Sequence, residues 1–222
     1  MSSTRFPVVI AITGASGAIY AIRLLQSLCQ SDQSVHLTIS PSGAAVIAQE
    51  TGLKVDLKHP DLSALISYVP DWTSDDRRAA TLAVDWGTAI DQKLHYHHYE
   101  DYFTPIASGS FQTSAMVVCP CSGSTLSSIA HAASNNLISR AAEVHLKEQR
   151  KLVLVPRETP LSVLQLENMQ RAAAAGATIL PAMPGWYHGV DSIDSLVDFV
   201  VGRILDQLQI DNQMIHRWKD TT

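Results

Sequence analysis

The 222-residue sequence has few cysteines, few charged residues and no cluster of basic residues. Its three cysteines, Cys29, Cys119 and Cys121, do not form a disulfide framework, so we expect a reducing compartment, the cytoplasm by default. Charged residues make up 17% of the chain, below the usual value of about one quarter, which indicates contacts between subunits. A net charge of −5 without a lysine or arginine run argues against nucleic acid as the main partner.

Long hydrophobic runs and metal-ligand spacings are also missing. The apolar run at residues 8–12 is too short for a signal peptide, and no run has the length of a membrane span, so we expect no membrane partner. Cys119 and Cys121 have no second cysteine or histidine pair at zinc spacing, so we expect no metal. A histidine-rich stretch at residues 95–99 lies where periodicity is absent, and we interpret it as a solvated or interface loop.

Apolar material for a large core is present, and it is arranged in short runs that alternate between strand and helix periodicity. Strands are expected at residues 8–13, 35–40, 116–119, 151–155 and 177–180, and helices at 18–29, 43–51, 124–133, 140–150, 161–175 and 192–208. The alternation predicts one doubly wound α/β domain, Rossmann-like or flavodoxin-like, with at least five parallel strands. Ligands of such folds bind beyond the carboxyl ends of the strands.

Two parts of this single 1–222 domain depart from the pattern. From about residue 54 to residue 105 the sequence is polar and aperiodic, which predicts an insertion of short helices and irregular chain. Residues 192–222 predict a long C-terminal helix followed by a tail.

Two turns between a strand and a helix could bind a ligand. Gly14, Ala15 and Ser16 follow the first strand, where glycine permits close backbone approach and the next helix offers free N–H groups. Residues 122–125, Ser-Gly-Ser-Thr, open a helix after the strand at 116–119. Each turn alone could be a plain connection or a helix cap. Two such turns in one parallel sheet favour a nucleotide-like ligand.

Charged residues also fall at predicted strand ends and on one helix. Arg140 and Lys147 are seven residues apart on the same helix face, and Arg157-Glu158 follows a buried strand. Cations at the ligand-binding edge suit a phosphorylated substrate, whereas any one of them alone could be a surface ion pair.

Several segments together resemble the flavin prenyltransferases of the UbiX type. They are residues 12–20, 107–111, 119–122, 136–142, 146–148, 154–160 (Leu-Val-Pro-Arg-Glu-Thr-Pro), 184–188 (Pro-Gly-Trp-Tyr-His) and Arg217-Trp218. The resemblance spans nearly the whole chain and is most specific at residues 156–160. The 54–102 stretch is longer and more polar than is usual in that family, so nothing is carried over to it.

The resemblance implies a homo-oligomer, a dodecamer with sites between subunits, that uses reduced FMN and dimethylallyl monophosphate. The prenyl group is joined to flavin N5 and then C6, without a metal. The product, prenylated FMN, serves a UbiD-type decarboxylase.

By position, the resemblance also implies site residues. Contacts to FMN are expected from Gly14, Ala15, Ser16, Ser40, Ser122, Gly123, Ser124, Thr125 and Arg140. The prenyl phosphate is expected to be bound by Lys147, Arg157, Glu158, Tyr187 and Arg203. Catalytic roles are expected for Ser16, Glu50, Lys147, Glu158 and Trp218. Ser16 and Glu50 would lie near the reacting flavin edge, Glu158 would relay a proton, and Trp218 would pack on the prenyl group.

Two other functions are considered. Flavin-dependent decarboxylases of peptidyl- or pantothenoyl-cysteine share the fold, but Arg157-Glu158 and the Tyr187 segment favour prenyl transfer. A flavin-binding subunit without catalysis is the second alternative, and the presence of Lys147 and Glu158 disfavours it.

Overall fold

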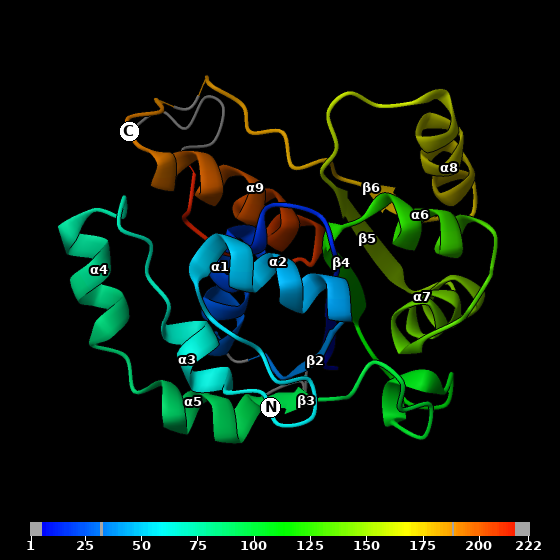
Figure 1. The fold of residues 1–222 in the computed structure, drawn as a ribbon, viewed down its shortest axis with the longest axis horizontal. Helices are drawn as coiled ribbons and strands as arrows, with labels where there is room; N and C mark the ends of the chain where they lie inside the picture. The colour runs from blue at the N-terminus through cyan, green and yellow to red at the C-terminus, as the bar shows by residue number, and fades with distance from the viewer. Residues whose placement is uncertain (1–5, 32, 188, 216–222) are drawn as a thin grey trace.

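The computed structural model describes residues 6–31, 33–187 and 189–215 and places a six-stranded parallel sheet at the centre of the molecule (Figure 1). The strands are β1 (Val8–Ile12), β2 (Val35–Ile39), β3 (Leu94–Tyr96), β4 (Ala115–Cys121), β5 (Lys151–Pro156) and β6 (Thr178–Ile179). Their order is β3-β2-β1-β4-β5-β6, and every neighbouring pair is parallel. The predicted α/β class is therefore confirmed.

The edge strand β3 is the strand that the sequence pattern did not predict. The five expected strands alone have the flavodoxin order, and β3 extends them to the 3-2-1-4-5-6 order of a Rossmann sheet. β3 has three residues, of which Leu94 is buried and His95 is exposed. Three residues are too few to show a strand period, and within the described part of the chain they pair with β2 alone.

Helices cover both faces of the sheet. One face carries α1 (Ala18–Gln30), α2 (Pro41–Thr51), α3 (Leu62–Ser67), α5 (Trp86–Lys93) and α9 (Ile193–Gln207), and the other carries α6 (Gly123–Ala130), α7 (Leu137–Lys147) and α8 (Val163–Ala174). Alternate residues of β1 divide between the two cores. Ile10 and Ile12 pack on the α1 side, whereas Val9 and Ala11 pack on the α7 side. The sheet is thus buried on both faces, as parallel sheets usually are.

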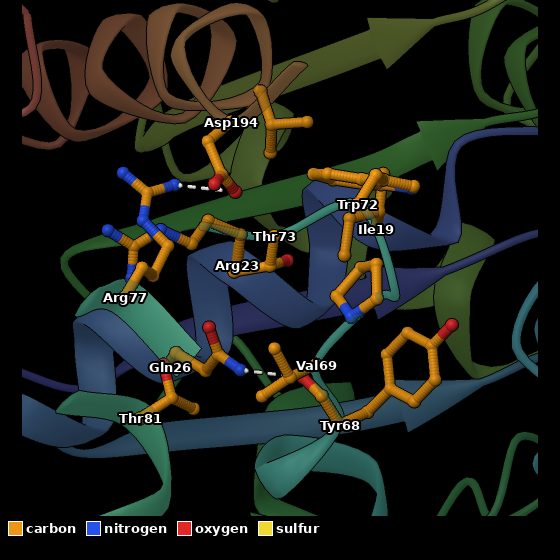
Figure 2. Close-up of a pocket in the computed structure, with 12 residues that line it drawn as sticks. Ile19, Arg23, Gln26, Tyr68, Val69, Trp72, Thr73, Arg77, Thr81 and Asp194 are labelled. Atoms are coloured by element: carbon orange, nitrogen blue, oxygen red, sulfur yellow. Dashed lines mark hydrogen bonds and ion pairs between the residues drawn. The ribbon is translucent and has the colours of Figure 1, made fainter. Parts of the chain in front are cut away.

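The 54–105 segment contains α3, α4 (Asp75–Leu82) and α5, and it adds β3 before the short 3₁₀ helix η1 (Pro105–Ala107). α4 lies apart from the sheet at the side of the molecule (Figure 1). Arg77 of α4 forms an ion pair of 3.1 Å with Asp194 of α9, and the pair is visible in Figure 2. Arg77 also pairs with Asp198, which Arg23 of α1 contacts at 2.8 Å. Through these ion pairs, the two buried carboxylates of α9 link the insertion to α9 and α1.

α7 begins earlier and ends earlier than the predicted 140–150. Asn136 caps it by accepting a hydrogen bond from the Ser139 N–H at 3.0 Å, so Arg140 lies within the first turns instead of starting the helix. The helix ends at Lys147, and Gln149 then takes a φ of 55° before β5 begins. This difference places Lys147 at the helix end.

The connections reverse direction between β1 and β4. From β1 the chain proceeds outward through β2 to β3, and it then returns to β4 on the other side of β1. At this switch point the carboxyl ends of β1 and β4 lie side by side, followed by the N-termini of α1 and α6. Ligands of doubly wound sheets bind at such a point. No helix in the described part of the chain is long and apolar enough to cross a membrane.

Candidate active site

The two predicted ligand-binding turns are joined directly by Thr13. Its buried hydroxyl donates to the Pro120 carbonyl at 2.7 Å and accepts from the Ser122 N–H at 2.9 Å. The side chain at the end of β1 therefore sets the position of the turn after β4. As a result, Gly14 and Ser122 belong to neighbouring turns at one edge of the sheet.

The first turn packs closely against the start of α2. A Cβ on Gly14 would lie 2.5 Å from the Cβ of Ser42, so this position cannot carry a side chain without displacing α2. Ser40 caps α2 by accepting from the Gly43 N–H at 3.0 Å, and the Ser40 N–H donates to the Ile12 carbonyl at 3.0 Å. Ser40 thus lies beside the Gly14 turn.

Glu50 of α2 binds the N-terminus of α1. Its carboxylate accepts hydrogen bonds from the Gly17 N–H, at 3.0 and 3.1 Å, and from the Ala18 N–H at 2.8 Å. A negative charge is favourable there because the helix dipole is positive at its N-terminus. Two N–H groups that could have bound a phosphate are therefore already occupied.

The second turn has N–H groups that remain available. The Ser122 hydroxyl accepts from the Thr125 N–H at 3.3 Å, and it lies 3.1 Å from the Ser124 hydroxyl. Among the described residues, none accepts a hydrogen bond from the Gly123 or Ser124 N–H. A Cβ on Gly123 would approach Gln165 to 3.3 Å, so the turn is narrow as well as polar. This N-terminus of α6 is the better place for an anion.

Arg157 and Glu158 lie at the same edge, beyond the carboxyl end of β5. The Arg157 Nε donates to the Ser16 carbonyl at 3.2 Å, which brings its guanidinium to the first turn. Glu158 accepts from Gln165 Nε2 at 3.2 Å. Gln165 was missed by sequence reasoning, although Ser162-x-x-Gln165 is a capping-box pattern and both capping bonds are formed.

Lys147 lies elsewhere in the same chain. It ends α7 just before β5 begins, and so it lies at the amino edge of the sheet, opposite Ser16. It is paired with Glu148. Arg140, earlier in the same helix α7, donates to the Ala107 carbonyl at 3.1 Å and lies 3.5 Å from Glu143. Neither cation contacts the two turns in the subunit.

Tyr187 and Arg203 form a separate group. The Tyr187 ring is exposed and packs edge-on against Phe199 of α9, with ring centroids 5.8 Å apart. Arg203 pairs with Asp206 at 2.9 Å and lines a cavity of about 280 Å³ whose other walls include Leu180 and Met183. Trp218 lies outside the described residues.

The cysteine thiols are poorly suited to be nucleophiles. Burial raises the pKa of Cys29 to about 11 and that of Cys121 to about 12, and it raises the pKa of Cys119 further. All three are free and buried. At neutral pH they are neutral thiols within the core. Within the described residues, no group of three His, Cys, Asp or Glu side chains could hold a metal ion.

The fold and these turns define a doubly wound α/β protein with a nucleotide-type site at its switch point. The model of the Flavoprotein family matches residues 1–205. The flavin prenyltransferase UbiX of Halalkalibacterium halodurans is 43% identical over 209 residues, which cover 94% of this chain and 91% of that protein. The chain belongs to the flavoprotein family and, within it, to the UbiX flavin prenyltransferases.

Solved structures agree with this assignment. The structure of AnUbiX (PadA1), in complex with FMN and dimethylallyl pyrophosphate, has a TM-score of 0.77 and 35% identity, and the match covers 98% of this chain and 100% of that one. A dodecameric FMN-dependent UbiX-like decarboxylase from Escherichia coli O157:H7 has a TM-score of 0.76 and 34% identity, covering 96% and 99%.

Proposed function

We propose that this protein transfers a dimethylallyl group from dimethylallyl monophosphate to N5 and C6 of reduced FMN. The observation that carries the proposal is that Arg157 donates to the Ser16 carbonyl of the first turn, while its neighbour Glu158 is hydrogen-bonded to Gln165, which lies against Gly123 of the second turn. A cation and a carboxyl group there suit the departure of a phosphate next to a bound flavin. The related AnUbiX structure, with FMN and dimethylallyl pyrophosphate, supports the same pairing of ligands.

The turns fit FMN in one orientation. The flavin phosphate belongs at the α6 turn, where the N–H groups of Gly123 and Ser124 are available and hydroxyls surround them. Because Glu50 occupies the N-terminus of α1, the Gly14–Ser16 turn is left for the ring system. The missing side chain of Gly14 permits close approach there. The bound, reduced flavin supplies the nucleophilic N5 and C6 atoms.

In the proposed reaction, the allylic C–O bond breaks as the bond to flavin N5 forms, and N5 releases its proton. The ring closes when the prenyl double bond takes up a proton and its carbon bonds to C6, which releases its own proton. Inorganic phosphate leaves with the electron pair of the C–O bond. Arg157 stabilises its charge, and Glu158 donates a proton to it. Ser16 and Glu50 lie at the first turn, beside the reacting edge.

The remaining phosphate ligands point to more than one subunit. Lys147 is at the opposite edge of the sheet from Ser16, so within one chain it does not reach the phosphate bound near Arg157. We propose that Lys147 and Arg140 of one subunit, with Tyr187, Arg203 and Trp218, complete the site of another. The dodecameric state of the relative from Escherichia coli supports a homododecamer.

We propose that the product, prenylated FMN, is passed to a UbiD-type decarboxylase in the cytoplasm. The three free cysteines support a reducing compartment. Among the alternatives, a flavin-dependent decarboxylase of peptidyl- or pantothenoyl-cysteine is disfavoured by the sequence identity to flavin prenyltransferases along nearly the full chain.

The proposal is tested by anaerobic incubation of the purified protein with FMNH₂ and dimethylallyl monophosphate, followed by mass spectrometry of the flavin. We expect a flavin heavier by one isoprene unit, and we expect the filtrate to activate an apo-decarboxylase of the UbiD type. Unmodified flavin with the monophosphate, together with modified flavin when the pyrophosphate replaces it, would overturn the choice of donor. Unmodified flavin with both donors would overturn prenyl transfer itself.

A further inference from the structure

The loop at residues 108–111 lies against the pair formed by Lys147 and Glu148. A Cβ on Gly109 would lie 2.8 Å from Lys147 Nζ and would overlap Glu148 Oε1, so the backbone of the loop touches both side chains. The two serines of the loop are exposed, and their hydroxyls are 2.9 Å apart. Lys147 and two hydroxyl groups therefore form one polar surface at the amino edge of the sheet.

Arg150 holds this loop in place. Its Nη2 donates to the Gly109 carbonyl at 2.6 Å, and its Nη1 donates to the Phe111 carbonyl at 2.7 Å. One guanidinium thus spans two carbonyls that are two residues apart. A lysine ammonium has no planar fork and is not matched to both acceptors at once. The two hydrogen bonds therefore depend on the planar shape of the guanidinium as well as on its charge.

Neighbouring groups keep Arg150 and the loop aligned. The Arg150 N–H donates to the His145 carbonyl at 2.8 Å, which fixes the backbone. Arg150 Nη1 also approaches the hydroxyl of Thr113 at 3.4 Å, and that hydroxyl is 2.8 Å from His145 Nε2. On the other side of the loop, the ring of Phe111 packs edge-on against His36, with centroids 5.1 Å apart. The loop is held from both sides.

We propose that Arg150 is a positioning residue for the prenyl-phosphate site, which holds the 108–111 loop against Lys147 so that Lys147 is presented to the phosphate. The inference rests on the proposed function, because it assigns Lys147 to phosphate capture. Arg150 donates its hydrogen bonds to carbonyls of the 108–111 loop, so it acts on phosphate binding through the loop and Lys147. Its loss weakens phosphate capture and leaves the flavin turns at the other sheet edge unchanged.

The test compares Arg150→Lys with a matched control, Arg78→Lys. Arg78 also donates to a loop carbonyl, that of Pro70 at 2.7 Å, but it belongs to the 54–105 insertion. We expect Arg150→Lys to raise KM for dimethylallyl monophosphate about 10-fold, the usual cost of one hydrogen bond to a charged group. FMN affinity and kcat should stay near the wild-type values, and Arg78→Lys should change none of these constants.

A second variant and a double mutant separate positioning from stability. Gly109→Ala retains Arg150 but inserts a methyl group between the loop and Lys147, and it should raise KM in the same way. Combined with Lys147→Ala, Arg150→Lys should add no further change in KM, because both act on one contact.

Additive effects of Arg150→Lys and Lys147→Ala, or an unchanged KM in a folded Arg150→Lys protein, would overturn the positioning role. Wild-type protein that produces no prenylated flavin would instead overturn the proposed function. In that case the affinity of each variant for inorganic phosphate, measured by calorimetry, decides the role of Arg150. We expect weaker phosphate binding by Arg150→Lys, and equal binding would reject the role.

Discussion

Replacement of Thr13 by valine tests whether the two ligand-binding turns are fixed to each other. Valine matches threonine in shape but cannot form the bonds of 2.7 Å to the Pro120 carbonyl and 2.9 Å from the Ser122 N–H. The Pro120 carbonyl retains a bond from the Thr13 N–H at 3.3 Å, whereas the buried Ser122 N–H loses its partner. We expect the free energy of unfolding to fall by about 2–4 kcal/mol, from one buried donor left without an acceptor and one lost hydrogen bond.

Thr38→Val is the matched control. Thr38 lies in the neighbouring strand β2 and is fully buried, and its hydroxyl has no hydrogen-bond partner among the described residues. Removing an unpaired hydroxyl should leave stability unchanged or raise it by about 1 kcal/mol.

The assay is thermal unfolding at one protomer concentration, together with an FMN titration followed by flavin fluorescence. Thr13→Val should lower Tm by several degrees, at about 2–4 °C per kcal/mol for a chain of this size, and should weaken FMN binding. Thr38→Val should retain wild-type affinity. Equal Tm values and equal FMN affinities for the two variants would refute the proposed role of Thr13.

Further predictions concern the substrate site, metals and pH. Lys147→Ala should raise KM for the prenyl phosphate with little change in kcat, because the lost interaction stabilises the ground state and the transition state equally. A fall in kcat at constant KM in steady-state assays would contradict this. Turnover should be unaffected by EDTA, since no zinc-type ligand set is found among the described residues, and activity that EDTA abolishes and Mg²⁺ restores would show the prediction to be wrong. Burial lowers the pKa of His145 to about 4 and that of His36 to about 4, below the ordinary value of 6.5. Both histidines favour the neutral form when folded, so the stability they contribute is complete above pH 6.5 and is lost as pH falls toward 4. Denaturant unfolding of the wild type and of His145→Gln across this pH range should show a smaller loss of unfolding free energy in the variant.

The sequence was sufficient to predict the sheet and the two turns because each depends on local patterns. β1 and β4 are continuous buried runs, and the small and hydroxyl residues after them are typical of a turn between a strand and a helix. The bond network of Thr13 could not be predicted, since it joins residues 107 and 109 positions apart. The edge strand β3 was missed because its pairing with β2 depends on contacts across the insertion rather than on its own three residues.

The relation between charged site residues was also beyond sequence reasoning. Arg140 and Lys147 appeared to belong with Arg157 because all are cations near predicted element ends. The structure places Lys147 at one sheet edge and Arg157 at the other, because a helix that leads into a parallel strand must end at the amino edge. Glu50 was expected near the reacting flavin edge from resemblance alone, and its hydrogen bonds to Gly17 and Ala18 depend on how α2 crosses the first turn.

The most direct measurement of the central claim is a single turnover with reduced FMN already bound, in which released phosphate and alkylated flavin are both quantified. The account predicts equal amounts of the two products. Glu158→Gln should slow both by roughly 10²–10⁴-fold, the usual contribution of one positioned acid–base group, while FMN remains bound. Phosphate release without flavin alkylation, or a wild-type rate in folded Glu158→Gln, would contradict the account.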